Sequence, residues 1–194
     1  MDLLSPFRRA TPDDAPLLVE FVNYAGEGLP LYLWSKLSGP EETAWDVGRR
    51  RALRVEGAFS YRNAMIVEHD GQPAGCLIGY EIPDHPEPVA SDLPAMFVPL
   101  QDLENHAPGT WYVNVLAVLP RYRKLGLGTK LLGLADRLAR SLGKRGMSVI
   151  VSDANAGARR LYERCHYVAR ACRPIVKENW THEGQNWVLL TKHL

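Results

Sequence analysis

The sequence predicts a mixed α/β fold, a central sheet flanked by helices. Expected strands and helices alternate through the second half of the 194-residue chain, and such alternation favours a sheet of this kind. In the first half, residues 69–73 carry an Asp-Gly hairpin signal between two apolar runs. A third signal is a glycine-bearing turn that follows an apolar run and precedes an amphipathic segment. A chain of this length buries a sizeable core, so we expect one domain over residues 1–194.

In the first half, breaks and apolar spacing define the elements. Thr11-Pro12-Asp13-Asp14 offers an N-cap and an acidic first turn to a helix with apolar residues at helical spacing. Glycine and proline interrupt the chain at 26–30 and 38–40, on either side of a short aromatic stretch. The expected elements are a strand over 5–10, helices over Ala15–Tyr24 and Glu41–Val55, and strands over Ala64–Glu68 and Gly75–Ile82.

A long acidic and proline-rich insertion at about 83–109 separates the two halves. A connection of this length in a compact domain is usually functional or disordered. The expected elements after it are strand 111–119, helix 126–142, strand Met147–Val151, helix Asn155–Arg164, and strands near Val168–Val176 and Trp187–His193.

Charge is unevenly distributed along the chain. Residues 63–120 contain eight acids and no lysine or arginine, whereas residues 121–194 contain 15 lysines and arginines against five acids. This asymmetry suggests a protein that handles both an anion and a cation. Arginines at 159, 160, 164, 170 and 173 could contact a nucleic acid, but the acidic block would repel phosphate, so we expect no such partner.

Several classes of site are not expected. No run of eighteen apolar residues occurs, so we expect no membrane span, and the N-terminus lacks a signal-peptide layout, which makes cytoplasmic residence the default. The six histidines show no close metal-ligand spacing, so we expect no metal site. Three cysteines, an odd count without ligand pairing, are expected as reduced thiols: Cys76, Cys165 and Cys172.

The glycine turn has the features of an anion site. Arg123-Lys-Leu-Gly126-Leu-Gly128 fits the pattern R-x-x-G-x-G and opens a helix. The first N–H groups of a helix are unpaired, and the helix dipole makes that end positive. No Gly-Lys-Ser/Thr follows, so this is not a Walker A loop, and the pattern is a poor dinucleotide fingerprint. We therefore interpret the turn as a pyrophosphate cradle.

A second group of residues follows the next strand. Asn155 can cap the expected helix, and Tyr162 lies two turns further along the same face. Both side chains could therefore border one groove, although a cap alone and an aromatic packed on the sheet are the simpler readings.

In order and spacing, these two groups resemble the GNAT superfamily of acetyl-CoA-dependent N-acetyltransferases. The resemblance covers most of the chain, with its core at Val115–Tyr167, and implies a mixed, mostly antiparallel sheet splayed at the strand before the turn. The family's Tyr-x-x-x-Gly-Phe has His166 in the glycine position here, which affects a turn. The coenzyme A contacts that the resemblance implies are Leu116, Ala117, Val118, Arg123, Lys124, Leu125, Gly126, Leu127, Gly128, Thr129, Asn155, Ala158 and Tyr162.

The resemblance implies direct transfer of an acetyl group from the thioester to a primary amine. Tyr162, with an ordinary pKa of about 10, is the expected acid for the leaving thiolate. Glu81, at the end of a strand, is the expected general base. Its rivals are Glu104, His106, Tyr112, Asn114 and a water relay.

The acceptor is less well defined by the sequence. An electronegative cleft would attract an ammonium group, so we expect a cationic small-molecule or peptide amine, bound by loops 25–40 and 83–109. The C-terminal strands could pair in a homodimer. Two alternatives stay open, transfer of another acyl group and a non-catalytic module that binds acyl-CoA.

Overall fold

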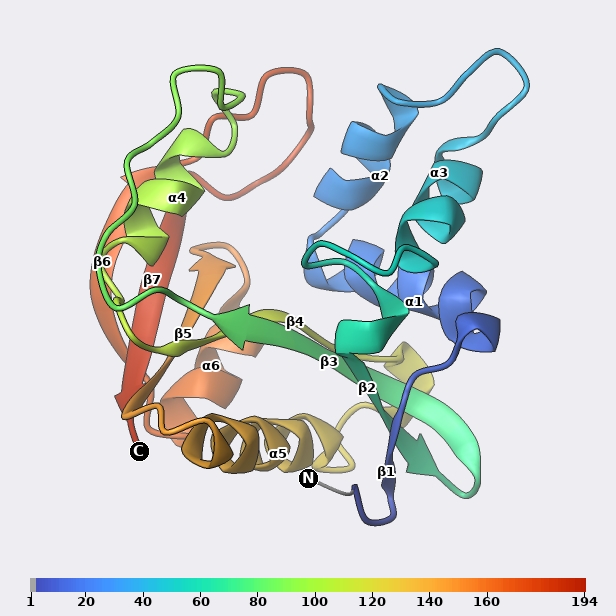
Figure 1. Cartoon of the computed structure of the whole chain (residues 1–194), viewed down its shortest axis with the longest axis vertical. Coiled ribbons are helices and arrows are strands. Elements are labelled where there is room, and N and C mark those ends of the chain that lie inside the picture. Colours follow the sequence, from blue (N-terminus) through green and yellow to red (C-terminus); the bar gives the residue numbers. More distant parts are fainter. Residues whose placement is uncertain (1–2) are drawn as a thin grey trace. The chain divides into compact units, whose positions relative to one another are not determined.

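The computed structural model describes residues 3–194, which form seven strands in one sheet (Figure 1). Along the sheet their order is β1-β2-β3-β4-β5-β7-β6. β4 and β5 pair in parallel, whereas the β1–β2, β2–β3, β5–β7 and β6–β7 pairs are antiparallel. The predicted mixed, mostly antiparallel sheet is confirmed. In chain order the strands are β1 (Phe7–Arg9), β2 (Ala64–His69), β3 (Gln72–Glu81), β4 (Trp111–Val118), β5 (Gly146–Ser152), β6 (Val168–Pro174) and β7 (Asn186–His193).

The chain divides into two compact units. The first consists of residues up to Gly79 together with Val115–Leu131, and the second of Tyr80–Asn114 and Leu132–Leu194. Within residues 3–194, six α-helices accompany the sheet: α1 (Ala15–Ala25), α2 (Leu29–Ser35), α3 (Ala44–Ala52), α4 (Val98–Glu104), α5 (Leu127–Ser141) and α6 (Ala156–Arg164).

In the first unit, α1, α2 and α3 pack against one another. Their apolar faces join buried side chains of β2, β3 and β4 in one core that includes Phe21, Trp34, Ile66 and Ile78. The predicted hairpin is confirmed in this unit, because His69 pairs with Gln72 and leaves Asp70-Gly71 as a two-residue turn. Both turn residues have positive φ, 51° and 71°, as the preferred hairpin turn requires.

In the second unit, a helix occupies part of the acidic insertion. α4 packs against β6 and β7 (Figure 1). The Arg173 guanidinium on β6 donates to the Asp102 carboxylate on α4, a contact across 71 positions of sequence. Pro99 stands in the first turn of α4, where a missing N–H costs nothing. Sequence pattern did not predict this helix, because a proline-rich segment of seven helical residues has little periodicity.

Candidate functional site

In the first unit, the turn before α5 exposes backbone N–H groups beside cations. Lys124 and Gly126 both have left-handed φ, 66° and 75°, and the residues from Arg123 to Gly126 are exposed. Lys130 donates its N–H to the Gly126 carbonyl over 3.1 Å. The N–H groups of the predicted contacts Leu127, Gly128 and Thr129 precede that bond, so they lie in the part of a helix that lacks intrahelical acceptors. This geometry suits an anion.

The end of β4 leads into this turn. Arg123 Nε donates to the Val118 carbonyl over 3.3 Å, which links the turn to the strand in the first unit. Val115 and Ala117 are buried, whereas Leu116 and Val118 are partly exposed, so the alternation of β4 gives one face to the core.

β4 pairs with β5 over a short register. In the second unit the pairs are Trp111 with Met147 and Tyr112 with Ser148. Within residues 3–194, the ladder between these two parallel strands contains no further pair. A strand whose ladder ends early keeps backbone hydrogen-bonding groups available for another partner.

In the second unit, Asn155 caps α6. Its Oδ1 atom accepts the Ala158 N–H over 3.0 Å, so the predicted N-cap is confirmed, and Ala158 lies in the first turn of the helix. Tyr162 follows two turns later, 5 % exposed, with its ring 5.6 Å from that of Tyr167. Burial raises the pKa of the Tyr162 phenol, and across residues 3–194 this hydroxyl makes no hydrogen bond. Tyr162 is therefore a protonated phenol without a fixed partner.

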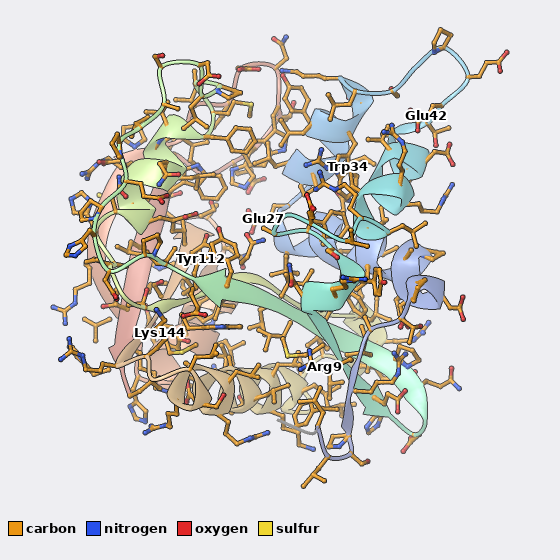
Figure 2. The ribbon with its side chains drawn as sticks, viewed as in Figure 1. Arg9, Glu27, Trp34, Glu42, Tyr112 and Lys144 are labelled. Carbon is orange, nitrogen blue, oxygen red and sulfur yellow. The ribbon has the colours of Figure 1, made fainter. Side chains whose placement is uncertain are left out.

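The two carboxylates considered as general bases differ in their surroundings. Glu81, the predicted base, ends β3 with a side chain 50 % exposed, and its carboxylate lies 3.0 Å from Lys144 Nζ. Lys144 follows α5 and is labelled in Figure 2. The rival base Glu104 is half-buried on α4 and accepts a hydrogen bond from the Tyr80 hydroxyl over 3.1 Å.

Two other rivals of Glu81 are less suited to take a proton from a substrate. His106 has its Nδ1 atom 2.7 Å from the Asp102 carbonyl and its Nε2 atom 3.4 Å from Arg173. Asn114 is exposed on β4, and an amide is not basic.

Tyr112, the last rival, is buried on β4 (Figure 2) with its ring centroid 5.2 Å from that of Tyr80. Burial raises the pKa of Tyr112, and nearby Tyr80, Glu104 and Tyr162 raise it further. The charges of Glu104 and Tyr162 therefore both act on Tyr112 within the second unit.

Comparison with known proteins identifies the family of this chain. A family model described as the acetyltransferase (GNAT) family matches residues 30–167, which is more than half of the chain. The chain belongs to the GNAT acetyltransferase family. Among curated protein sequences, none matches this chain.

Solved structures share the fold of this GNAT protein. An N-acetyltransferase from Staphylococcus aureus Mu50 aligns with a TM-score of 0.66 and 16 % identity, over 96 % of this chain and 99 % of that one. A ribosomal-protein-alanine N-acetyltransferase from Brucella melitensis gives 0.63 and 19 %, over 99 % and 100 %. A GNAT acetyltransferase from Elizabethkingia anophelis with acetyl-CoA bound gives 0.51 and 16 %, over 68 % and 75 %.

In this GNAT chain, His166 occupies the family's glycine position after α6. Its φ is 68°, in the left-handed region where glycine is unstrained. The replacement of the family's glycine by His166 therefore affects the backbone of the turn at the end of the helix, as the sequence suggested.

The predicted residues fall into two groups within this GNAT chain. Residues 116–118 and 123–129 belong to the first unit, whereas Glu81, Asn155, Ala158 and Tyr162 belong to the second. The sequence analysis did not single out Tyr80. Strand alternation places Tyr80 on the face opposite its neighbour Glu81, the residue that the sequence analysis chose as the base. An aromatic at that position next to the acidic insertion was the available signal.

The other candidate groups of the GNAT chain are basic side chains, metal-ligating side chains and cysteines. Arg170 donates to Thr191, and Arg173 binds Asp102, so these two basic side chains have partners within the protein. In the part that the structure describes, no group of three or more metal-ligating side chains could hold an ion, and no helix is long and apolar enough to cross a membrane. The three cysteines are free thiols.

Proposed function

We propose that the chain transfers the acetyl group of acetyl-CoA to a primary amine of a cationic small molecule or peptide. The exposed cationic turn before α5 carries this proposal, since its free N–H groups and positive charge suit a pyrophosphate. Family membership and the acetyl-CoA found in a GNAT structure of similar fold support the choice of donor.

Each group of predicted residues has a role in this reaction. Residues 123–129 bind the pyrophosphate through backbone N–H groups, and Leu116, Ala117 and Val118 bond the pantetheine arm through the β4 backbone. Asn155 and Ala158 border the donor on α6. An N–H of β4, that of Val118 or its neighbour, polarises the thioester carbonyl, and Tyr162 gives its proton to the leaving thiolate.

The acidic insertion supplies the preference for a cation. Residues 63–120 contain eight acids and no lysine or arginine. Basic residues elsewhere in the chain pair with Glu68, Glu81 and Asp102, and the remaining acids attract an approaching ammonium and repel a competing anion.

Thiol release tests the proposal. The protein is incubated with acetyl-CoA and a panel of amines of different charge, and products are identified by mass spectrometry. We expect release of coenzyme A and acetylated product with cationic primary amines. Release with another acyl-CoA instead would support the acyl-group alternative, whereas tight coenzyme A binding without turnover on any amine would support the non-catalytic module.

Charge reversal tests the acceptor preference. Changing Glu81, Asp84 or Glu87 to lysine should raise the acceptor KM, by several-fold at low salt and less at high salt, because salt screens exposed charges. Glu87 binds Asn105 through backbone atoms, so its side chain can be changed without losing that contact. Glu183→Lys is a control with the same charge change at an exposed site. Equal KM values in all four variants would mean that the acidic block is ordinary surface charge.

A further inference from the structure

The side chain of Glu104 is a half-buried carboxylate, and among residues 3–194 no basic side chain forms an ion pair with it. Its hydrogen bond comes from the neutral Tyr80 hydroxyl. From residue 3 to the C-terminus, no lysine, arginine or histidine forms an ion pair with it, although Asp102 on the same helix has Arg173. Burying a charge without a counter-charge is costly. A carboxylate in that situation is suited to receive a cation from outside the chain.

The surroundings of Glu104 include other chemically useful groups. Tyr80 from β3 and Tyr112 from β4 lie beside it, their rings 5.2 Å apart, and aromatic faces attract cations. The charge of a Tyr162 phenolate would also raise the pKa of Tyr112. Glu104 is therefore linked to Tyr112 through Tyr80, and both Glu104 and Tyr162 act electrostatically on this buried tyrosine within the second unit.

We propose that Glu104, oriented by Tyr80, binds the acceptor ammonium and takes its proton, in place of Glu81. This inference rests on the proposed acetyltransferase activity. The other candidate, Glu81, is half-exposed and already has Lys144 as a counter-ion at 3.0 Å, so its charge is both solvated and neutralised.

The acceptor nitrogen loses two protons during the reaction. The acceptor ammonium gives one proton to the Glu104 carboxylate, and the freed lone pair on nitrogen forms a bond to the acetyl carbon. The carbon–sulfur bond then breaks, and the thiolate takes a proton from Tyr162. A second proton from the acceptor nitrogen restores the phenol as the amide forms, and Glu104 releases its proton to solvent.

The electrostatics of Glu104 agree with this role. Burial, and then the negative charge of Glu87, raise the pKa of Glu104 above its ordinary value, whereas the Tyr80 hydrogen bond lowers it. On β6 the charged group facing α4 is Arg173, held by Asp102 and close to His106. A base with a raised pKa works more efficiently near neutral pH.

The test measures kcat/KM against pH for three variants. Glu104→Gln keeps the size of the side chain and an oxygen that can accept from Tyr80. We expect its kcat/KM to fall about 100-fold at pH 7 and to recover as pH approaches the pKa of the amine itself. Tyr80→Phe removes the bond that favours the carboxylate, so the acidic limb of the profile should move to higher pH. Glu87→Gln removes a like charge and should move that limb to lower pH.

Controls separate the possible failures. Glu81→Gln distinguishes the two candidate bases, and Asp92→Asn is an exposed carboxylate-to-amide change in the same insertion. If the wild type acetylates no amine, the proposed function fails. If the wild type is active and Glu104→Gln keeps its rate and pH profile, or if Glu81→Gln shows the 100-fold loss instead, this inference is wrong. Should Glu104→Gln not fold, opposite shifts in Tyr80→Phe and Glu87→Gln support the inference, and unmoved profiles overturn it.

Discussion

Replacement of Tyr162 with phenylalanine is expected to lower turnover at least about tenfold while coenzyme A binding stays nearly intact. The phenol is 5 % exposed, and burial raises its pKa, so it is protonated throughout the range in which the enzyme would be assayed. A phenol hydroxyl without a hydrogen-bond partner inside the protein can donate its proton to a thiolate. Phenylalanine keeps the ring that packs on Tyr167 and removes that proton. Steady-state kinetics and a direct binding measurement with coenzyme A report the two quantities separately.

Tyr167→Phe is the matched control for this change. The Tyr167 hydroxyl is buried without a hydrogen-bond partner among residues 3–194, and its ring is the neighbour of the Tyr162 ring. Removing it takes one hydroxyl from the same aromatic pair, so turnover should change little. Equal losses in both variants would mean that Tyr162 acts through packing, and unchanged turnover in Tyr162→Phe would remove its role as acid.

Local signals predicted the elements that depend on neighbouring residues. The Asp-Gly pair fixes the β2–β3 hairpin through the φ values of its own two residues. Asn155 caps α6 by a bond to the N–H three positions later. The R-x-x-G-x-G turn likewise depends on the φ of Gly126 and on the start of a helix. The residues that form each of these features lie within a few positions of one another, so the feature can be predicted from one sequence.

Contacts between distant segments could not be predicted in this way. α4 is held by the bond from Arg173 to Asp102, which lie 71 positions apart. The sequence of neither segment indicates that it contacts the other. The bond between Tyr80 and Glu104 spans 24 positions through a proline-rich connection. Sequence analysis could therefore place Glu104 only among several candidate bases. The structure distinguishes it from Glu81 by showing which acid has a counter-ion.

Gly48→Ala is expected to lower the free energy of unfolding by about 1–3 kcal/mol, because it overpacks a dense part of the core. Gly48 is buried on α3, and a Cβ there would lie 2.7 Å from both Trp34 Cζ3 and Val19 Cγ1. Trp34 (Figure 2) is 4 % exposed and Val19 1 %, so neither is free to move aside. Denaturant unfolding followed by tryptophan fluorescence measures the change.

Gly133→Ala provides a control of opposite sign. In α5, a Cβ at this position meets no atom nearer than the end of the flexible Arg137 side chain at 4.0 Å. Alanine is the better helix former by up to about 1 kcal/mol, so this variant should be more stable than the wild type. Glycine-to-alanine substitution at the two positions thus distinguishes the effect of helix propensity on stability from the effect of overpacking the core. A stabilised Gly48→Ala would show that Trp34 and Val19 can shift at little cost, and the packing argument for the first unit would then be wrong.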